Sequence, residues 1–383
     1  MARRAGLHLV LIVAASAIAA VAGDEFIERF SQVPWQEFAG GRFKASTAAT
    51  LTATTMAGAV FELKPGGLRE LHWHDAAEWA MVLDGTCMAV ATDEGVTHAS
   101  DAWNFTFGDV WYFPRNVPHA VLGAGRRGCT YVTAYNSPTL NELEAFGASA
   151  WLATVPVDAL AQGLGLSAAS AQQVLDANPG KAANFIGLGD LGELLREAPA
   201  LPQRQWPQLI HRFPLLQNTP EVVNADGSTV NMVDVTRFPV SSDMSGALVR
   251  IAAGGMRQLH WHLGINEWQY VLNGTFEVGV FTAVGASASG VLRPGDLGFA
   301  PRGSGHYLRN VGPTPGAVVL IFDAGRFSNV DVGNFLGASP PSWTAASLNI
   351  SGQLARRINY ALPGFAPRQG PPPSGARVAA AAA

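Results

Sequence analysis

Short runs rich in Val, Phe, Trp and Tyr recur along the chain, and glycine and proline residues separate them. The pairs Asp84-Gly85 and Asn273-Gly274 follow two of these runs, and such pairs are typical of two-residue β-hairpin turns. The pattern therefore predicts antiparallel strands. Because many short strands with this punctuation are typical of sandwiches and barrels, we expect an all-β fold.

This strand pattern occurs twice. Residues 56–85, MAGAVFELKPGGLRELHWHDAAEWAMVLDG, align with residues 244–274, MSGALVRIAAGGMRQLHWHLGINEWQYVLNG, with one residue inserted before the second glutamate. Residues 108–123, GDVWYFPRNVPHAVLG, align with residues 295–310, GDLGFAPRGSGHYLRN. The chain is therefore a tandem duplication, and each copy has about the length of a jelly roll.

Two segments depart from the strand pattern. Residues 151–178 carry apolar residues at helical spacing, and Ser167 is placed to cap a second short helix. The end of the chain, PGFAPRQGPPPSGARVAAAAA, is of low complexity and is expected to be disordered. The predicted organisation is an N-terminal barrel over 40–150, a helical connector over 151–200, a C-terminal barrel over 205–350 and a disordered tail over 363–383.

The composition agrees with two folded domains. The chain has 383 residues, more than one average domain, and 48% of them are hydrophobic, which supports packed cores. With 25 basic and 29 acidic residues the net charge is -4, and no long basic run is present. Nucleic acid is therefore not an expected partner.

The first residues resemble an export signal. Arg3 and Arg4 precede an apolar run, and Ala20 and Ala22 bracket a valine at its end. This arrangement is typical of a cleaved secretory signal, here over residues 1–22. A membrane anchor needs ~20 apolar residues, more than this run provides. We therefore expect a secreted protein without membrane contact after cleavage.

Two other features of the sequence are relevant if the protein is exported. Asn104, Asn273 and Asn349 each begin a glycan acceptor triplet, which suggests a glycoprotein. Cys87 and Cys129 are the two cysteines of the chain, and they can pair in an oxidising compartment. Two unpaired buried thiols explain the sequence equally well.

Six of the nine histidines fall at matching positions of the two copies. Residues two apart on a strand share a face, so the two histidines of each HWH stretch point the same way, and the tryptophan between them is expected to pack on the other face. These residues are His72, Trp73 and His74 in the first copy and His260, Trp261 and His262 in the second.

A carboxylate and a third imidazole complete each group. Glu78 or Glu267 follows the HWH stretch, and His119 or His306 lies in the second motif of the same copy. Three nitrogens and one oxygen leave positions open on an octahedral metal. This set without thiolate suits Mn(II) or Fe(II); zinc is an alternative, although closed structural zinc sites more often use cysteine.

These motifs resemble those of the bicupins, which have two tandem cupin (double-stranded β-helix, jelly-roll) barrels. In GGLRELHWH, AEWAMVLDG, GDVWYFPRNVPH, GGMRQLHWH, NEWQYVLNG and GHYLRNVG the chain is similar to the oxalate decarboxylase family, over about residues 40–345. The first copy departs from the cupin pattern at Asn116 and Gly123, where glycine and asparagine are usual. The resemblance implies one Mn(II) per barrel, held by His72, His74, Glu78 and His119 and by His260, His262, Glu267 and His306.

The resemblance also implies an activity. Members of this family convert oxalate to formate and CO2 with dioxygen as cofactor, and cupins often form homo-oligomers. Arg69 and Arg257 match the arginine that holds substrate, and Arg69 is expected to act in catalysis. Strand alternation would place Arg69 on the face opposite to His72, so this role requires a twist or a bulge between them.

The family's proton carrier lies on a lid after the first barrel. Gapless counting from Trp151 places it at Glu142, with Leu143 and Glu144 where the family has polar residues. In the second copy, Leu320 stands where the family has a glutamate. We therefore expect catalysis mainly at the N-terminal site and little turnover at the C-terminal one.

Two alternatives to a decarboxylase remain at this point. The altered lid is compatible with an oxalate oxidase, which yields CO2 and hydrogen peroxide. The cupin fold also serves storage and binding proteins without activity, although storage relatives usually lose their metal ligands and all eight are present here.

Overall fold

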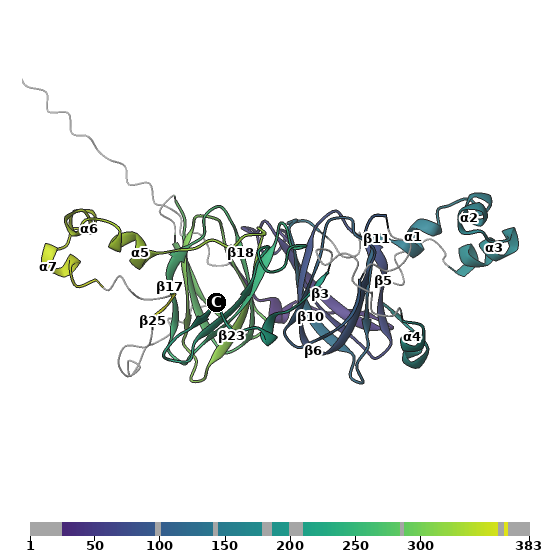
Figure 1. The fold of residues 1–383 in the computed structure, drawn as a ribbon, viewed down its shortest axis with the longest axis horizontal. Helices are drawn as coiled ribbons and strands as arrows, with labels where there is room; N and C mark the ends of the chain where they lie inside the picture. Colours follow the sequence, from purple (N-terminus) through teal and green to yellow (C-terminus); the bar gives the residue numbers. More distant parts are fainter. Residues whose placement is uncertain are drawn as a thin grey trace, which may run out of the picture.

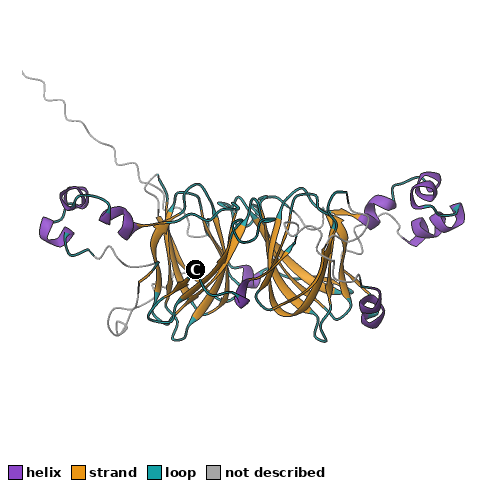
Figure 2. Cartoon of the chain, in the orientation of Figure 1, coloured by secondary structure: helices purple, strands orange, loops and turns teal. Residues whose placement is uncertain are grey.

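The computed structural model consists of two β-barrels side by side, each with a helical arm at its outer end (Figures 1 and 2). It describes residues 25–95, 101–140, 145–177, 186–198, 210–283, 287–358 and 364–366. The long strand pairs of both barrels are antiparallel, as the sequence pattern predicted.

The first barrel contains the first copy of the repeat and is followed by the connector. Its strands are β2 (Gln36–Phe38), β3 (Gly41–Ser46), β4 (Ala57–Leu63), β5 (Gly67–Trp73), β6 (Glu78–Ala91), β7 (Asp101–Thr106), β8 (Asp109–Phe113), β9 (His119–Gly123), β10 (Cys129–Tyr135), β11 (Phe146–Gly147) and β12 (Ile186–Leu188). The connector helices are α1 (Ala148–Leu152), α2 (Val157–Leu164), α3 (Ala168–Ala177) and α4 (Leu191–Glu197).

The second barrel repeats this order. Its strands are β14 (Val222–Val223), β15 (Thr229–Val233), β16 (Ser245–Ile251), β17 (Met256–Trp261), β18 (Glu267–Asn273), β19 (Phe276–Phe281), β20 (Ser287–Leu292), β21 (Leu297–Ala300), β22 (Gly305–Asn310), β23 (Gly316–Phe322), β24 (Val330–Asp331) and β25 (Phe365–Ala366). Its arm consists of α5 (Val332–Gly337), α6 (Pro341–Leu348) and α7 (Gly352–Ala355).

The prediction of hairpin turns at the Asp-Gly and Asn-Gly pairs was wrong. Strand β6 continues through Gly85, which has a φ of +74°, and its pairing with β10 shifts register at Leu83, two residues earlier. Before Gly85 the strand pairs with β8 and β10, and after it with β7 and β9. After Asn273 the chain likewise passes from one sheet to another. The glycines bend the chain between sheets instead of reversing it.

The two halves of the chain exchange short strands. Near the N-terminus, β1 (Ile27–Glu28) pairs with β21 of the second barrel. Just before the second barrel, β13 (Arg212–Pro214) pairs with β8 of the first. The expected division into 40–150 and 205–350 was therefore too simple, because each barrel includes a strand from outside its own copy.

A tryptophan from each copy fills the interface between the barrels. Trp79 and Trp268 are both fully buried and belong to one core cluster that spans the two halves. Trp268 lies against Gly58 of the first barrel, where an added Cβ would come within 2.3 Å of its ring. Trp79 lies against Gly246 of the second barrel in the same way, at 2.4 Å. The interface thus has the same contact twice, with the two copies exchanged.

The predicted connector is helical over α1 to α4, and Ser167 accepts a hydrogen bond from the Ser170 amide at the start of α3, at 3.1 Å. It is not helical at residues 186–188, where β12 pairs with β5 of the first barrel. The expectation of a disordered tail was wrong for residues 364–366. Phe365 is fully buried, and β25 pairs with β17. The remaining tail, 367–383, and the expected signal, 1–22, lie outside the described residues.

Cys87 and Cys129 form a disulfide between β6 and β10, with their Cα atoms 5.3 Å apart. Of the two alternatives for these cysteines, the structure therefore shows the disulfide. Among the described residues, no helix has both the length and the apolar character needed to cross a membrane.

We predict that Gly58→Ala destabilises the protein by about 1–3 kcal/mol, because the new methyl group must displace the buried Trp268 ring. Urea unfolding measures the loss. Gly305→Ala is the matched control, since a Cβ there has nothing within 4 Å. The double variant with Trp268→Phe should recover part of the loss, and additive effects of the two changes would contradict the contact.

Candidate metal centres

A β-bulge in each barrel brings the arginine and the first histidine of the copy to the same interior face. In the pairing of β5 with β9, Arg69 lies opposite Val121 and His72 opposite His119. Strand β5 therefore has one extra residue between the two positions, and the pairing of β17 with β22 has the same irregularity between Arg257 and His260. The bulge that the arginine's proposed position required is present in both copies.

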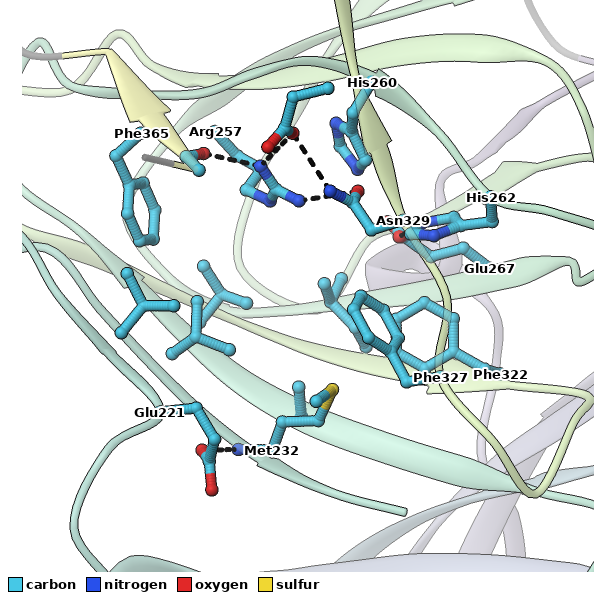
Figure 3. Close-up of a pocket in the computed structure, with 17 residues that line it drawn as sticks. Glu221, Met232, Arg257, His260, His262, Glu267, Phe322, Phe327, Asn329 and Phe365 are labelled. Atoms are coloured by element: carbon cyan, nitrogen blue, oxygen red, sulfur yellow. Dashed lines mark hydrogen bonds and ion pairs between the residues drawn. The ribbon is translucent and has the colours of Figure 1, made fainter. Parts of the chain in front are cut away.

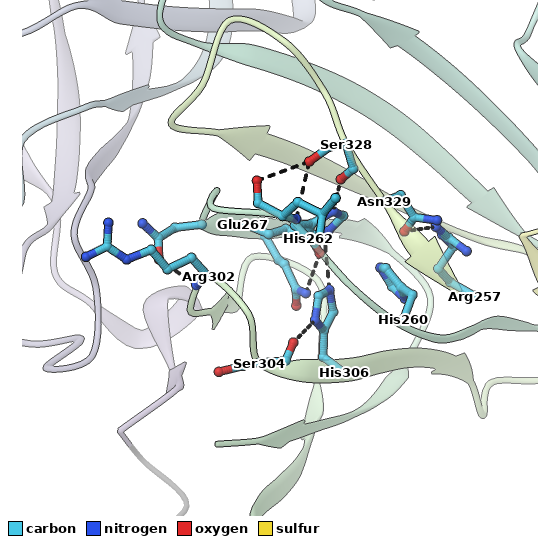
Figure 4. Close-up of polar contacts among 12 residues, drawn as sticks. Arg257, His260, His262, Glu267, Arg302, Ser304, His306, Ser328 and Asn329 are labelled. Atoms are coloured by element: carbon cyan, nitrogen blue, oxygen red, sulfur yellow. Dashed lines mark hydrogen bonds and ion pairs between the residues drawn. The ribbon is translucent and has the colours of Figure 1, made fainter. Parts of the chain in front are cut away.

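The second barrel gathers a compact set of potential ligands. His260, His262, Glu267 and His306 are all buried, and one ligand atom from each lies within 4.8 Å of the others. Glu267 Oε2 lies 2.8 Å from His262 Nε2 and 3.5 Å from His306 Nε2. Figure 4 shows these side chains converging from β17, β18 and β22 and, for His262, from the residue that follows β17.

The first barrel gathers the equivalent residues. His72, His74 and His119 are buried, with ligand atoms within 4.8 Å of one another. Glu78 adjoins them, because its Oε2 atom lies 3.3 Å from His74 Nε2 and 3.5 Å from His119 Nε2. The structure thus brings together in each barrel the four residues that the sequence singled out.

Each of these imidazoles is oriented by a backbone carbonyl at its Nδ1 atom. A nitrogen that donates to a carbonyl carries the proton, so in the neutral ring the Nε2 atom is left with a lone pair. The acceptors are the carbonyls of Glu70, Ala76 and Val117 for His72, His74 and His119, and those of Gln258, Ser328 and Ser304 for His260, His262 and His306, at 2.6–2.9 Å.

Burial favours the neutral form of three of these imidazoles. It lowers the pKa of His72 and of His260 well below the ordinary value of 6.5, and it lowers the pKa of His119 as well. Burial alone would raise the pKa of the Glu78 and Glu267 carboxyls, but the neighbouring imidazoles outweigh it and both pKa values lie well below the usual range. Burial thus favours the neutral form of His72, His119 and His260, beside carboxyl groups that stay ionised.

This state fits a bound cation. In the neutral tautomer, Nε2 lone pairs face a carboxylate oxygen at 2.8–3.5 Å, and two acceptors at that distance need a cation or a proton between them. Among the described residues, His119 Nε2 and His306 Nε2 are buried without a hydrogen-bond partner. Three nitrogens and one oxygen suit a divalent transition metal.

The two copies hold the carboxylate by different side chains. In the first, Trp111 Nε1 donates to Glu78 Oε1 at 2.9 Å. In the second, Gly298 takes the place of this tryptophan, and Gln269 Nε2 donates to Glu267 Oε1 at 2.7 Å. The large and the small residue of the strand pair are exchanged between the copies. In the first copy Trp111 lies opposite the small Ala80, and in the second Gly298 lies opposite the larger Gln269. The hydrogen bond thus comes from the neighbouring strand β8 in the first copy and from the same strand as the glutamate, β18, in the second.

The arginines have different surroundings. Arg69 is buried, and its backbone pairs with Ile186 of β12. The Arg257 guanidinium donates to Asp331 Oδ1 at 3.0 Å, to Asn329 Oδ1 at 2.8 Å and to the carbonyl of Gly364 at 2.5 Å. Arg257 is therefore held by the chain's own oxygens, although the sequence had suggested it as a substrate ligand.

Other expected residues fall in three groups. Glu142 lies outside the described residues. Leu320 is buried and lines a cavity beside the second metal set. Trp73 packs on the outer face as predicted, stacked on Phe146 with ring centroids 5.7 Å apart, and Trp261 contacts Phe335.

Sequence reasoning missed several residues around the two centres. Asn329 and Asp331 bind Arg257, and Phe365 lies beside it in the cavity wall. All three lie in segments without a repeated motif, so the sequence pattern did not indicate them. Trp111 did have one: aligned with the second copy, it falls opposite a glycine within otherwise similar strings.

Comparisons with known proteins agree with this geometry. The family model described as cupin matches residues 36–172 and again 214–356. The chain is 31% identical over 289 residues to the oxalate decarboxylase of Bacillus subtilis (strain 168), covering 75% of this chain and 72% of the relative. It is 27% identical over 350 residues to an oxalate decarboxylase of Arthroderma benhamiae, covering 84% and 79%.

Solved structures give the same result. A structure of Bacillus subtilis oxalate decarboxylase, from a study of its Mn(II) centres, superposes with a TM-score of 0.79 at 26% identity and covers 90% of this chain and 89% of its own. With two cupin matches and relatives of this kind over most of its length, the chain belongs to the cupin family and, within it, to the bicupin oxalate decarboxylases.

Proposed function

We propose that the protein is a secreted, manganese-dependent oxalate decarboxylase that works mainly in its first barrel. The observation that carries this proposal is the buried set of three imidazoles and one carboxylate in each barrel, with an arginine brought to the same face by a bulge. The named relatives are oxalate decarboxylases, and one neighbouring structure belongs to a study of Mn(II) centres.

The charge of the site supports a small dianion as substrate. Three neutral imidazoles and one carboxylate leave a divalent metal with a net positive charge, and the buried Arg69 lies on the same face of its strand as His72. His72, His74, Glu78 and His119 would hold Mn(II). When bound, the metal supplies, together with dioxygen, the one-electron chemistry that makes the carbon–carbon bond of oxalate labile.

The overall reaction consumes one proton, since the oxalate dianion and a proton give formate and CO2. A general acid/base must therefore take a proton from the bound substrate and return it to the carbon that becomes formate. We assign this role to Glu142 on the sequence resemblance. Leu320 carries no proton, so the second barrel is proposed to bind metal with little turnover.

The activity is tested by incubating the manganese-loaded protein with oxalate under air. We expect formate and CO2 in comparable amounts, and Glu142→Gln should lower formate production by about 10²–10⁴-fold because the proton carrier is lost. Glu144→Gln, two residues away on the same segment, is the matched control and should keep most of the activity.

His306→Ala should also spare most of the turnover if the first barrel does the work, provided that thermal melting shows a folded protein. No formate from the wild-type protein, or equal losses from Glu142→Gln and His306→Ala, would refute these assignments. Hydrogen peroxide in stoichiometric amount with little formate would instead identify an oxidase.

Trp111→Phe should weaken metal binding in the first barrel by about 10- to 100-fold, because the Glu78 carboxylate loses its orienting hydrogen bond. Manganese titration with EPR detection measures each site. The second site should be unaffected, and Gln269→Leu should reverse the pattern. Unchanged affinity at both sites in both variants would contradict the orienting role.

Secretion is supported by the disulfide, since such bonds persist in oxidising compartments, and by the exposure of Asn104, Asn273 and Asn349. We expect protein recovered from the culture medium to begin near Gly23 and to resist thiol alkylation until it is reduced, both measured by mass spectrometry. Full-length protein retained in the membrane fraction would contradict export.

A further inference from the structure

The interiors of the two barrels are filled by different side chains. In the first barrel, three aromatic rings stack across adjacent strands, with centroids 5.2 Å and 4.8 Å apart. The strand registers place valines at the equivalent positions of the second barrel. The three rings are those of Phe43, Phe61 and Tyr131, and the three valines are Val230, Val249 and Val318.

The second barrel, where valines replace the rings, contains a cavity, and two of the valines, Val230 and Val249, line it. Its volume is about 210 Å³, and Figure 3 shows the side chains around it. One wall is apolar and includes Val230, Met232, Val249, Leu320 and Phe322. An apolar cavity of about 150 Å³ is large enough to bind benzene, so this one can hold a ring-sized body.

The opposite wall is polar and convergent. His260, His262 and Glu267 of the metal set line the cavity, together with Arg257 and its partners (Figure 3). Glu221 lies at the far side, where its carboxylate accepts from the Met232 amide and pairs with Arg237. The carboxylate of Glu221 is therefore already neutralised by the chain.

The charges facing the cavity favour a monoanion. A divalent metal held by one carboxylate keeps one positive charge. Arg257 adds no net charge because it forms an ion pair with Asp331 at 3.0 Å. A dianion such as oxalate would exceed the charge available here, and it would leave the apolar wall uncovered.

We propose that the second barrel binds a monocarboxylate with a compact apolar body, of the benzoate type. Its carboxylate faces the metal set, and its body lies against Val230, Val249 and Leu320 in place of the aromatic rings of the first barrel. The proposal rests on the proposed function only in that the second set holds a metal.

The test is calorimetric titration of the metal-loaded protein with benzoate. We expect one site per chain with a Kd at or below about 1 mM and a negative heat-capacity change, which marks burial of apolar surface. Acetate lacks the apolar ring of benzoate, and benzyl alcohol lacks its carboxylate. Each should bind at least tenfold more weakly than benzoate. No benzoate binding, or equal binding of acetate, would overturn the proposal.

Two substitutions at Val249 and one control locate the site. Val249→Phe installs the residue that the first copy has at this position and should weaken benzoate binding at least tenfold, while the smaller Val249→Leu should weaken it less. Val223→Phe is the matched control, because Val223 is exposed on β14 outside the cavity. Equal affinity in Val249→Phe and Val223→Phe would also overturn the proposal.

Benzoate binding is measured without turnover, so its absence does not bear on oxalate decarboxylation. Formate production from oxalate decides the proposed function independently. A protein that forms formate and ignores benzoate would refute only the proposal for the second barrel.

Discussion

Each barrel holds three imidazoles and a carboxylate away from water, and the cost of burying these groups shapes the strands around them. Polar groups taken from water without partners destabilise a fold by several kcal/mol. Here the Nδ1 atoms donate to backbone carbonyls and the carboxylates accept from Trp111 or Gln269. Among the described residues, His119 Nε2 and His306 Nε2 stay buried without a hydrogen-bond partner, and a cation bound among the ligands would satisfy both.

The two copies have diverged around this shared requirement. The first barrel is filled by stacked aromatic rings, and one of its tryptophans orients the metal-binding glutamate. The second orients its glutamate with a glutamine, and it holds its arginine with Asp331 and Asn329. Duplication has thus kept the ligand set in both barrels while the volume and charge beside it changed. Identical ligands do not imply identical substrates.

Much of this arrangement could be predicted from the sequence because the ligands recur at fixed spacing. The repeated HWH stretches and the later histidines predicted the metal set. The need for a bulge near Arg69 followed from strand alternation only after the family resemblance had assigned this arginine to the site. The function of Gly85 could not be predicted, because a glycine with positive φ serves a hairpin turn or a bend between sheets equally well. The contacts of Arg257 depend on segments far away in the sequence, which no local pattern reveals.

The exchanged strands β1 and β13 carry a consequence for the evolution of the chain. Each covers a strand whose backbone groups would otherwise lie open at the margin of the other barrel, and an uncovered strand of this kind is a template for aggregation. Neither half is therefore a self-sufficient unit that could be deleted or shuffled without exposing such a margin. The exchange thus gives each barrel a structural role, the covering of a strand of the other, that does not depend on catalysis.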